Sequence, residues 1–112
     1  MDQLHPNLGR WLMREQEAAY ALARLGMEAA AERARQDAAC LRGILLLAEQ
    51  QVPKLPPAGG GAGLRQLYGE SLRLGEEYRA HAEDPEFGCV LNALAEHKTA
   101  RCFALLRRIG KG

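Results

Sequence analysis

The chain has 112 residues, of which 47% are hydrophobic and 5% aromatic, a length and composition that predict one ordered domain with a single core. Fifteen Lys and Arg residues and fourteen Asp and Glu residues leave a formal charge of +1, and no long run of one sign occurs. We therefore expect no nucleic-acid partner. We also expect no membrane span, because no apolar run approaches the roughly 18 residues that it requires.

Helix-forming residues dominate the sequence, and apolar residues recur at three- and four-residue spacing. The first apolar stripe follows a helix-start signal at residues 5–7 and predicts a helix over about 7–25, with Gly26 as its stop. A second stripe predicts a helix that ends at Pro53. Because almost nothing separates the two helices, residues 7–52 are expected to form an antiparallel hairpin.

Residues 53–63 are rich in proline and glycine and predict a connection without helix. Asp84-Pro85-Glu86 then predicts the start of a last helix, because Asp caps a helix and Pro suits its first position, so residues 64–109 make a second hairpin. The connection can extend about 36 Å, which allows either a crossover along the helices or an ordinary loop. The predicted fold is all-α, an antiparallel four-helix bundle in one domain.

Each apolar stripe is interrupted by polar residues that the helical period of about 100° per residue turns inward. These five residues are Glu15, Asp37, Ser71, Lys98 and Arg101. One such residue alone would be explained by the edge of a stripe or by a side chain that snorkels to water. Two acids and two bases together instead predict an internal ion-pair network, because a charge is seldom buried without a partner. The pattern leaves open which acid pairs with which base.

The run YRAHAEDPEFGCVLNALAEHKTARCFALL, residues 78–106, resembles the last hairpin of rubrerythrin-like members of the ferritin-like superfamily. Members of that family typically show a tyrosine, an Asp-Pro-Glu helix start, a Leu-Ala pair, an E-x-x-H motif and a leucine-rich end. Residues 37–42 are similar to the segment that follows the first E-x-x-H of the family. The resemblance covers most of the chain, because the two hairpins and the crossover correspond as well.

In that family, two carboxylates and two E-x-x-H motifs bind a di-iron or di-manganese centre. Taken helix by helix, the resemblance places the ligand positions on Glu15, on Ala34 and Asp37, on Ser71, and on Lys98 and Arg101. Cationic side chains cannot be ligands in such a centre, so the resemblance implies a degenerate metal site without a cofactor. The charges of the two cations would replace that of the metal. With the nearby tyrosine, the predicted internal polar cluster is Glu15, Asp37, Ser71, Tyr78, Lys98 and Arg101.

An alternative register treats Glu49 and the pair Glu96-His97 as remnants of metal motifs. It gives an iron or manganese site made of Glu15, Asp37, Glu49, Glu96 and His97. However, adjacent helical residues point about 100° apart, so Glu96 and His97 cannot both face one bundle centre.

Three hypotheses therefore stay open, and one of them, a helical-hairpin adaptor unrelated to ferritins, has the same composition and would be distinguished by the crossover topology. The favoured one is a non-catalytic structural or protein-interaction module, with a homodimer or another helical protein as the partner. The alternative is a rubrerythrin-type metal-binding oxidoreductase with altered ligands. Trp11, Tyr20, Tyr68 and Phe103 are expected to offer apolar area beyond the core, with Tyr20 and Phe103 as the candidates for an association surface.

The three cysteines, Cys40, Cys89 and Cys102, are an odd number without C-x-x-C spacing. This spacing indicates neither a disulfide framework nor a structural zinc site. Because the first residues also lack the apolar core of a signal peptide, we expect reduced thiols and a cytoplasmic protein.

Overall fold

The computed structural model describes residues 4–48, 50–54 and 61–111. These residues form four α-helices, which are α1 (Leu4–Arg24), α2 (Glu28–Leu47), α3 (Leu64–Ala80) and α4 (Gly88–Gly110). No strand occurs in the described ranges, and the predicted all-α fold class is confirmed. Within the same ranges, no helix has the length and apolar character needed to cross a membrane.

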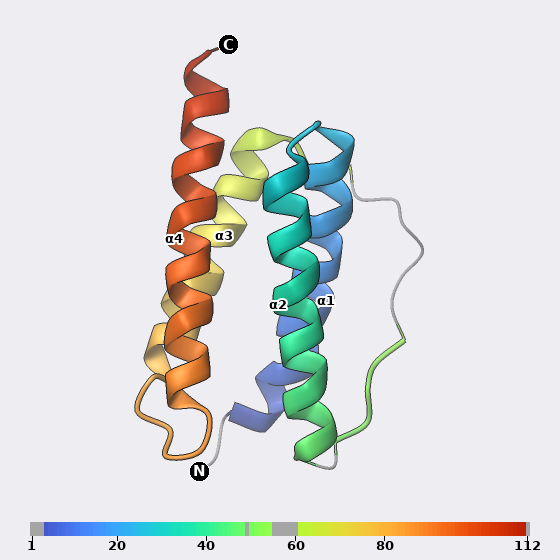
Figure 1. The fold of residues 1–112 in the computed structure, drawn as a ribbon, viewed down its shortest axis with the longest axis vertical. Helices are drawn as coiled ribbons and strands as arrows, with labels where there is room; N and C mark the ends of the chain where they lie inside the picture. The colour runs from blue at the N-terminus through green and yellow to red at the C-terminus, as the bar shows by residue number, and fades with distance from the viewer. Residues whose placement is uncertain (1–3, 49, 55–60, 112) are drawn as a thin grey trace. The chain divides into compact units, whose positions relative to one another are not determined.

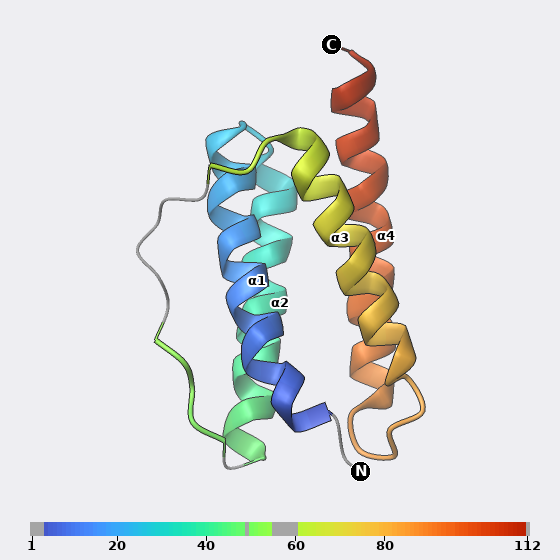
Figure 2. The same cartoon turned by 180° about the vertical axis from the view of Figure 1, so that it is seen from behind.

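The helices pair as two compact units, one within Met1–Gly61 and the other within Ala62–Gly112. In the N-terminal hairpin α1 packs along α2, and in the C-terminal hairpin α3 packs along α4 (Figures 1 and 2). Both pairs are antiparallel, as their short connections predict. These are the helix pairs expected of an antiparallel four-helix bundle. The single domain and the crossover over 53–63 stay predictions, and residues 55–60 lie outside the described ranges.

Gly26 ends α1 as predicted. Its φ of 80° lies in the left-handed region, which glycine adopts without the strain of a Cβ atom. The amides of Gly26 and Met27 donate to the carbonyl oxygens of Ala23 and Leu22 at 3.0 and 2.9 Å. This pair of bonds is the Schellman motif, which satisfies carbonyls that the end of a helix would otherwise leave without donors.

Two helix boundaries differ from the prediction. α1 begins at Leu4, three residues earlier than expected, so that His5 and Pro6 belong to its first turn. Proline is tolerated there because the first four amides of a helix have no acceptor within it. α2 ends at Leu47, before the predicted end at residue 52. The amide of Gln50 donates to the carbonyl oxygen of Leu45 at 2.8 Å, five residues back instead of four, so the α-helical pattern is already broken there. Pro53 in turn disfavours helical backbone at the residue before it.

The start of α4 also differs. Oδ1 of Asp84 accepts hydrogen bonds from the amides of Glu86 and Phe87 at 2.9 and 2.8 Å, so the predicted cap is present. It caps a turn, however, and the helix begins at Gly88, three residues later than expected. A Cβ atom at Gly88 would overlap the carbonyl oxygen of Ala82, so this close approach of two backbone segments requires glycine.

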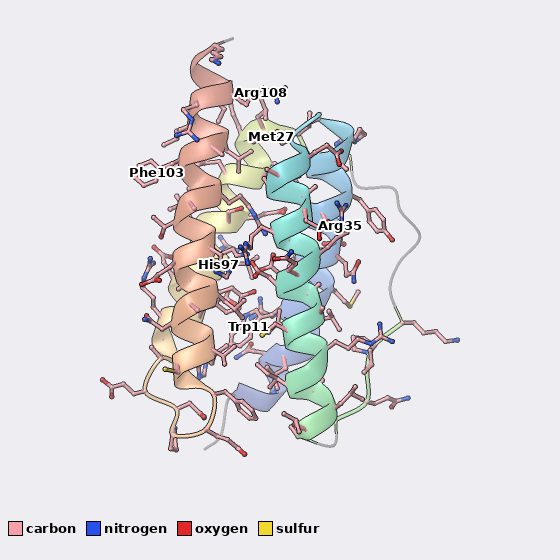
Figure 3. All side chains as sticks on the ribbon, in the orientation of Figure 1. Trp11, Met27, Arg35, His97, Phe103 and Arg108 are labelled. Atoms are coloured by element: carbon pink, nitrogen blue, oxygen red, sulfur yellow. The ribbon has the colours of Figure 1, made fainter. Side chains whose placement is uncertain are left out.

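The aromatic residues divide between core and surface. Trp11 is 0% exposed, so the prediction that it offers apolar area beyond the core is wrong. It lies one turn from the buried Leu8 and Glu15, on the face of α1 that carries the core. Tyr20 and Phe103 are exposed as predicted, and Phe103 projects away from α4 (Figure 3). Tyr68 is half-buried.

Candidate functional site

Two carboxylates of the N-terminal hairpin are buried. Glu15 on α1 is 0% exposed, and Asp37 on α2 is 2% exposed. Each has a buried apolar residue one turn before it and another one turn after it, which are Leu12 and Ala19 for Glu15 and Ala34 and Leu41 for Asp37. Both acids therefore lie within the apolar face of their helix, as the spacing predicts, and not at its edge.

Two cations of the C-terminal hairpin are buried in the same way. Lys98 and Arg101 on α4 are 1% and 4% exposed, and Ser71 and Tyr78 on α3 are 1% and 0% exposed. Nη1 of Arg101 donates to Oγ of Ser71 at 3.5 Å, a long hydrogen bond that links α3 to α4. A Cβ atom at Gly75 would come within 3.3 Å of Cβ of Lys98, so the missing side chain lets α3 lie close to the lysine.

The buried charges are compensated by hydrogen bonds. Across residues 4–48, 50–54 and 61–111, every buried side-chain nitrogen and oxygen has a hydrogen-bond partner. Glu15, Asp37, Lys98 and Arg101 all make polar interactions. A buried ion without a partner costs several kcal/mol. Because these four side chains have partners, their burial is compatible with a stable core.

The two hairpins differ in the sign of their buried charge, and their thiols respond to it. Burial raises the pKa of Cys40, and the carboxylate of Asp37 raises it further. Burial also raises the pKa of Cys102, but there the nearby charges of three cations, Arg101, Lys98 and Arg79, act in the opposite direction. The charged groups buried in the N-terminal hairpin are therefore acids, and those buried in the C-terminal hairpin are bases.

The structure buries all six residues of the predicted cluster, which helical spacing alone had turned inward. Within one hairpin it brings Ser71 and Arg101 together. The grouping of the acids of one hairpin with the bases of the other stays a prediction.

The residues of the alternative metal site are placed differently from one another. Glu15 and Asp37 are buried and His97 is half-buried, whereas Glu96 is exposed, and Glu49 lies outside the described residues. In the part of the chain that the structure describes, no three His, Cys, Asp or Glu side chains are grouped so that they could bind a metal ion. The geometry of this part therefore adds nothing to the alternative, which depends on the resemblance alone.

Several residues of interest were not found by the sequence reasoning. Arg79 on α3 donates to Oγ1 of Thr99 on α4 at 2.7 Å, and its charge reaches Cys102. Four leucines are largely exposed although leucine usually marks the core, namely Leu46, Leu47, Leu72 and Leu106. The sequence did contain a sign of their exposure, because these leucines lie outside the apolar stripes of their helices.

No family model matches the sequence, and comparison with curated proteins and with solved structures also found no match. The likeness to rubrerythrin-like proteins therefore depends on the residues of the chain itself.

Proposed function

We propose that this chain is a non-catalytic, ferritin-like helical module in which internal ion pairs take the place of a di-metal centre. In this proposal the buried acids of the N-terminal hairpin pair with the buried bases of the C-terminal hairpin inside a four-helix bundle. The module then acts through its outer surface, by binding a second copy or another helical protein.

The observation that carries the proposal is the burial of Lys98 and Arg101 on α4, where the resemblance places an E-x-x-H motif. A protonated lysine has three hydrogen-bond donors and no lone pair, and a guanidinium has five donors and no acceptor. Neither group can ligate a cation, and both repel one. In a metal site, the positive charge of the metal ion balances the negative charge of the carboxylates. Here the positive charges of Lys98 and Arg101 would do so instead.

The balance of charge supports the pairing. The N-terminal hairpin buries two acids, Glu15 and Asp37, and the C-terminal hairpin buries two bases, Lys98 and Arg101. Either set alone would leave like charges in a medium of low dielectric, which is strongly unfavourable. Apposition of the two sets gives a cluster without net charge. The same arrangement leaves no oxygen-rich site of the kind that iron and manganese bind.

The state of the cysteines bears on where the protein acts. Cys40, Cys89 and Cys102 are all free. Free thiols persist in a reducing compartment, and we therefore assign the action of the module to the cytoplasm.

Metal reconstitution tests the proposal. The purified protein is incubated with Fe(II) or Mn(II), desalted and analysed for metal by elemental analysis, and then assayed for peroxide reduction. We expect neither stoichiometric metal nor activity. About one or more metal ions retained per chain would contradict the proposal and favour the oxidoreductase.

A control variant identifies the ligands if metal does bind. Glu96→Gln combined with His97→Gln removes two residues of the alternative site, the exposed Glu96 and the half-buried His97. Metal that the native chain retains and this variant loses would establish the alternative register. Metal retained equally by both would place the ligands elsewhere and would still refute the absence of a metal centre.

A further inference from the structure

The face of α4 that points away from Lys98 and Arg101 is exposed along the helix. Four of its residues, Glu96, Ala100, Phe103 and Arg107, are all exposed. At about 100° per residue they fall within a stripe of about 60°, on the side of the helix opposite the buried residues. We call these four residues the outer stripe of α4.

The centre of the outer stripe is apolar. Phe103 is 58% exposed and projects away from α4 into open space (Figure 3). Leu106, 43% exposed, lies one turn further along the helix, and Leu72 on α3 is 45% exposed. Because α3 and α4 are antiparallel, the hydrogen bond from Arg101 to Ser71 sets their register and puts Leu72 at the height of Ala100. An exposed aromatic ring with an exposed leucine one turn along the same helix is typical of a protein–protein contact.

The ends of the outer stripe carry opposite charges. Glu96 and Arg107 are eleven positions apart, which is about 16 Å along the axis and almost the same direction around it. Neither makes a side-chain ion pair within the described residues. The midpoint between them lies between residues 101 and 102, which is also the midpoint between Ala100 and Phe103.

This symmetry makes the stripe complementary to itself. In a second helix laid antiparallel across it, the partner's Arg107 faces Glu96 and the partner's Glu96 faces Arg107. The large Phe103 then faces the small Ala100 of the partner, twice. A parallel arrangement would instead oppose equal charges at both ends.

We propose that a second copy of this chain docks antiparallel on the outer stripe of α4, with Phe103 at its centre and a Glu96–Arg107 ion pair at each end. The proposal deepens the proposed function by naming the partner. It rests on that function in one respect only, namely that Lys98 and Arg101 belong to the inner face of α4 and leave the opposite face to the partner. Two-fold symmetry closes the assembly at a dimer.

Charge reversal tests the register. Dissociation constants are measured by sedimentation equilibrium at low ionic strength for the native chain, for Glu96→Arg and for Arg107→Glu. Each variant converts two attractions into two repulsions, so its dimer should weaken roughly tenfold or more. An equimolar mixture of the two variants should regain the native affinity, because every contact in the mixed dimer joins opposite charges. The double variant Glu96→Arg, Arg107→Glu should dimerise as the native chain does.

Matched controls separate the stripe from general effects. Glu83→Arg makes the same change of charge at an exposed site in the turn before α4 and should leave the dissociation constant unchanged. Phe103→Ala should weaken the dimer, whereas Leu46→Ala, at a similar exposure of 60% in the N-terminal hairpin, should not. Circular dichroism confirms that each variant is folded.

A native chain that stays monomeric at every concentration would overturn the proposal. A dimer that tolerates both single reversals, or that the mixture does not restore, would overturn it as well. None of these results depends on the buried charges, because the substituted residues are exposed. The proposed function is judged separately, by metal content and by the stability of variants at Arg101.

Discussion

Replacement of Arg101 by leucine tests whether the buried guanidinium compensates a buried carboxylate. Arg101 is 4% exposed, its polar interactions are satisfied, and Nη1 donates to Ser71. Removal of one partner of a buried ion pair costs about 3–5 kcal/mol, because the other charge is left without compensation. The leucine side chain recovers part of this by its own burial, so we expect a net loss of about 3 kcal/mol.

The matched control is Arg73→Leu on α3, which makes the same substitution at an exposed position and should change the stability by less than about 0.5 kcal/mol. Both variants are unfolded in urea and followed by circular dichroism. With a slope of roughly 1–3 kcal/mol per molar urea, the midpoint for Arg101→Leu should fall by about 1–3 M. If the two variants lose the same amount, the guanidinium compensates nothing in the core and the reasoning is wrong.

Three further predictions follow from burial and close approach. Gly88→Ala should destabilise the fold by about 1–3 kcal/mol in urea unfolding, because the added Cβ overlaps the carbonyl group of the preceding turn. Gly43→Ala should instead stabilise it by about 0.5–1 kcal/mol, because the added Cβ meets open space at a helical position in α2. An equal effect at both sites would contradict this. Trp11→Ala should cost about 3–5 kcal/mol, and the native Trp11 should resist a soluble fluorescence quencher; ready quenching would place the ring at the surface. The exposed Cys89 should react with a thiol reagent well before Cys102, whose pKa burial raises; reaction at equal rates would count against this.

The thiol of Cys102 also gives stability a dependence on pH. Because its pKa is raised in the folded state, the folded chain holds this proton more tightly than the unfolded chain does. The resulting stability is therefore complete at neutral pH and is lost as the pH rises past the ordinary thiol value of 9.0. Urea unfolding of Cys102→Ala across this range should show a weaker fall than that of the native chain, and an unchanged fall would assign the effect to other groups.

Local signals in the sequence predicted much of the fold. Gly26 ends α1 because the left-handed backbone that closes the helix is a property of that single residue. Asp84 was predicted as a cap and does accept two amide hydrogen bonds. The start of α4 was nevertheless misplaced, because the contact between Gly88 and Ala82 depends on the path of the whole turn, which residue preferences do not describe.

Burial of the polar cluster was predictable because it follows from spacing alone. A helix with a known apolar face turns Glu15 and Lys98 inward whatever they contact. The partners of buried charges were not predictable, because spacing within one helix says nothing about which side chains meet across helices. Trp11 was misjudged because short helices were expected to bury limited surface, although its spacing already placed it in the core.

Double-mutant cycles between the acids and the bases test the central claim most directly. Glu15→Gln and Asp37→Asn are each combined with Lys98→Met and with Arg101→Leu, and the free energies of unfolding are compared with the single variants. Paired charges predict that at least one combination recovers about 1–3 kcal/mol of the summed losses. Four combinations whose losses simply add, within about 0.5 kcal/mol, would mean that no buried acid is paired with a buried base.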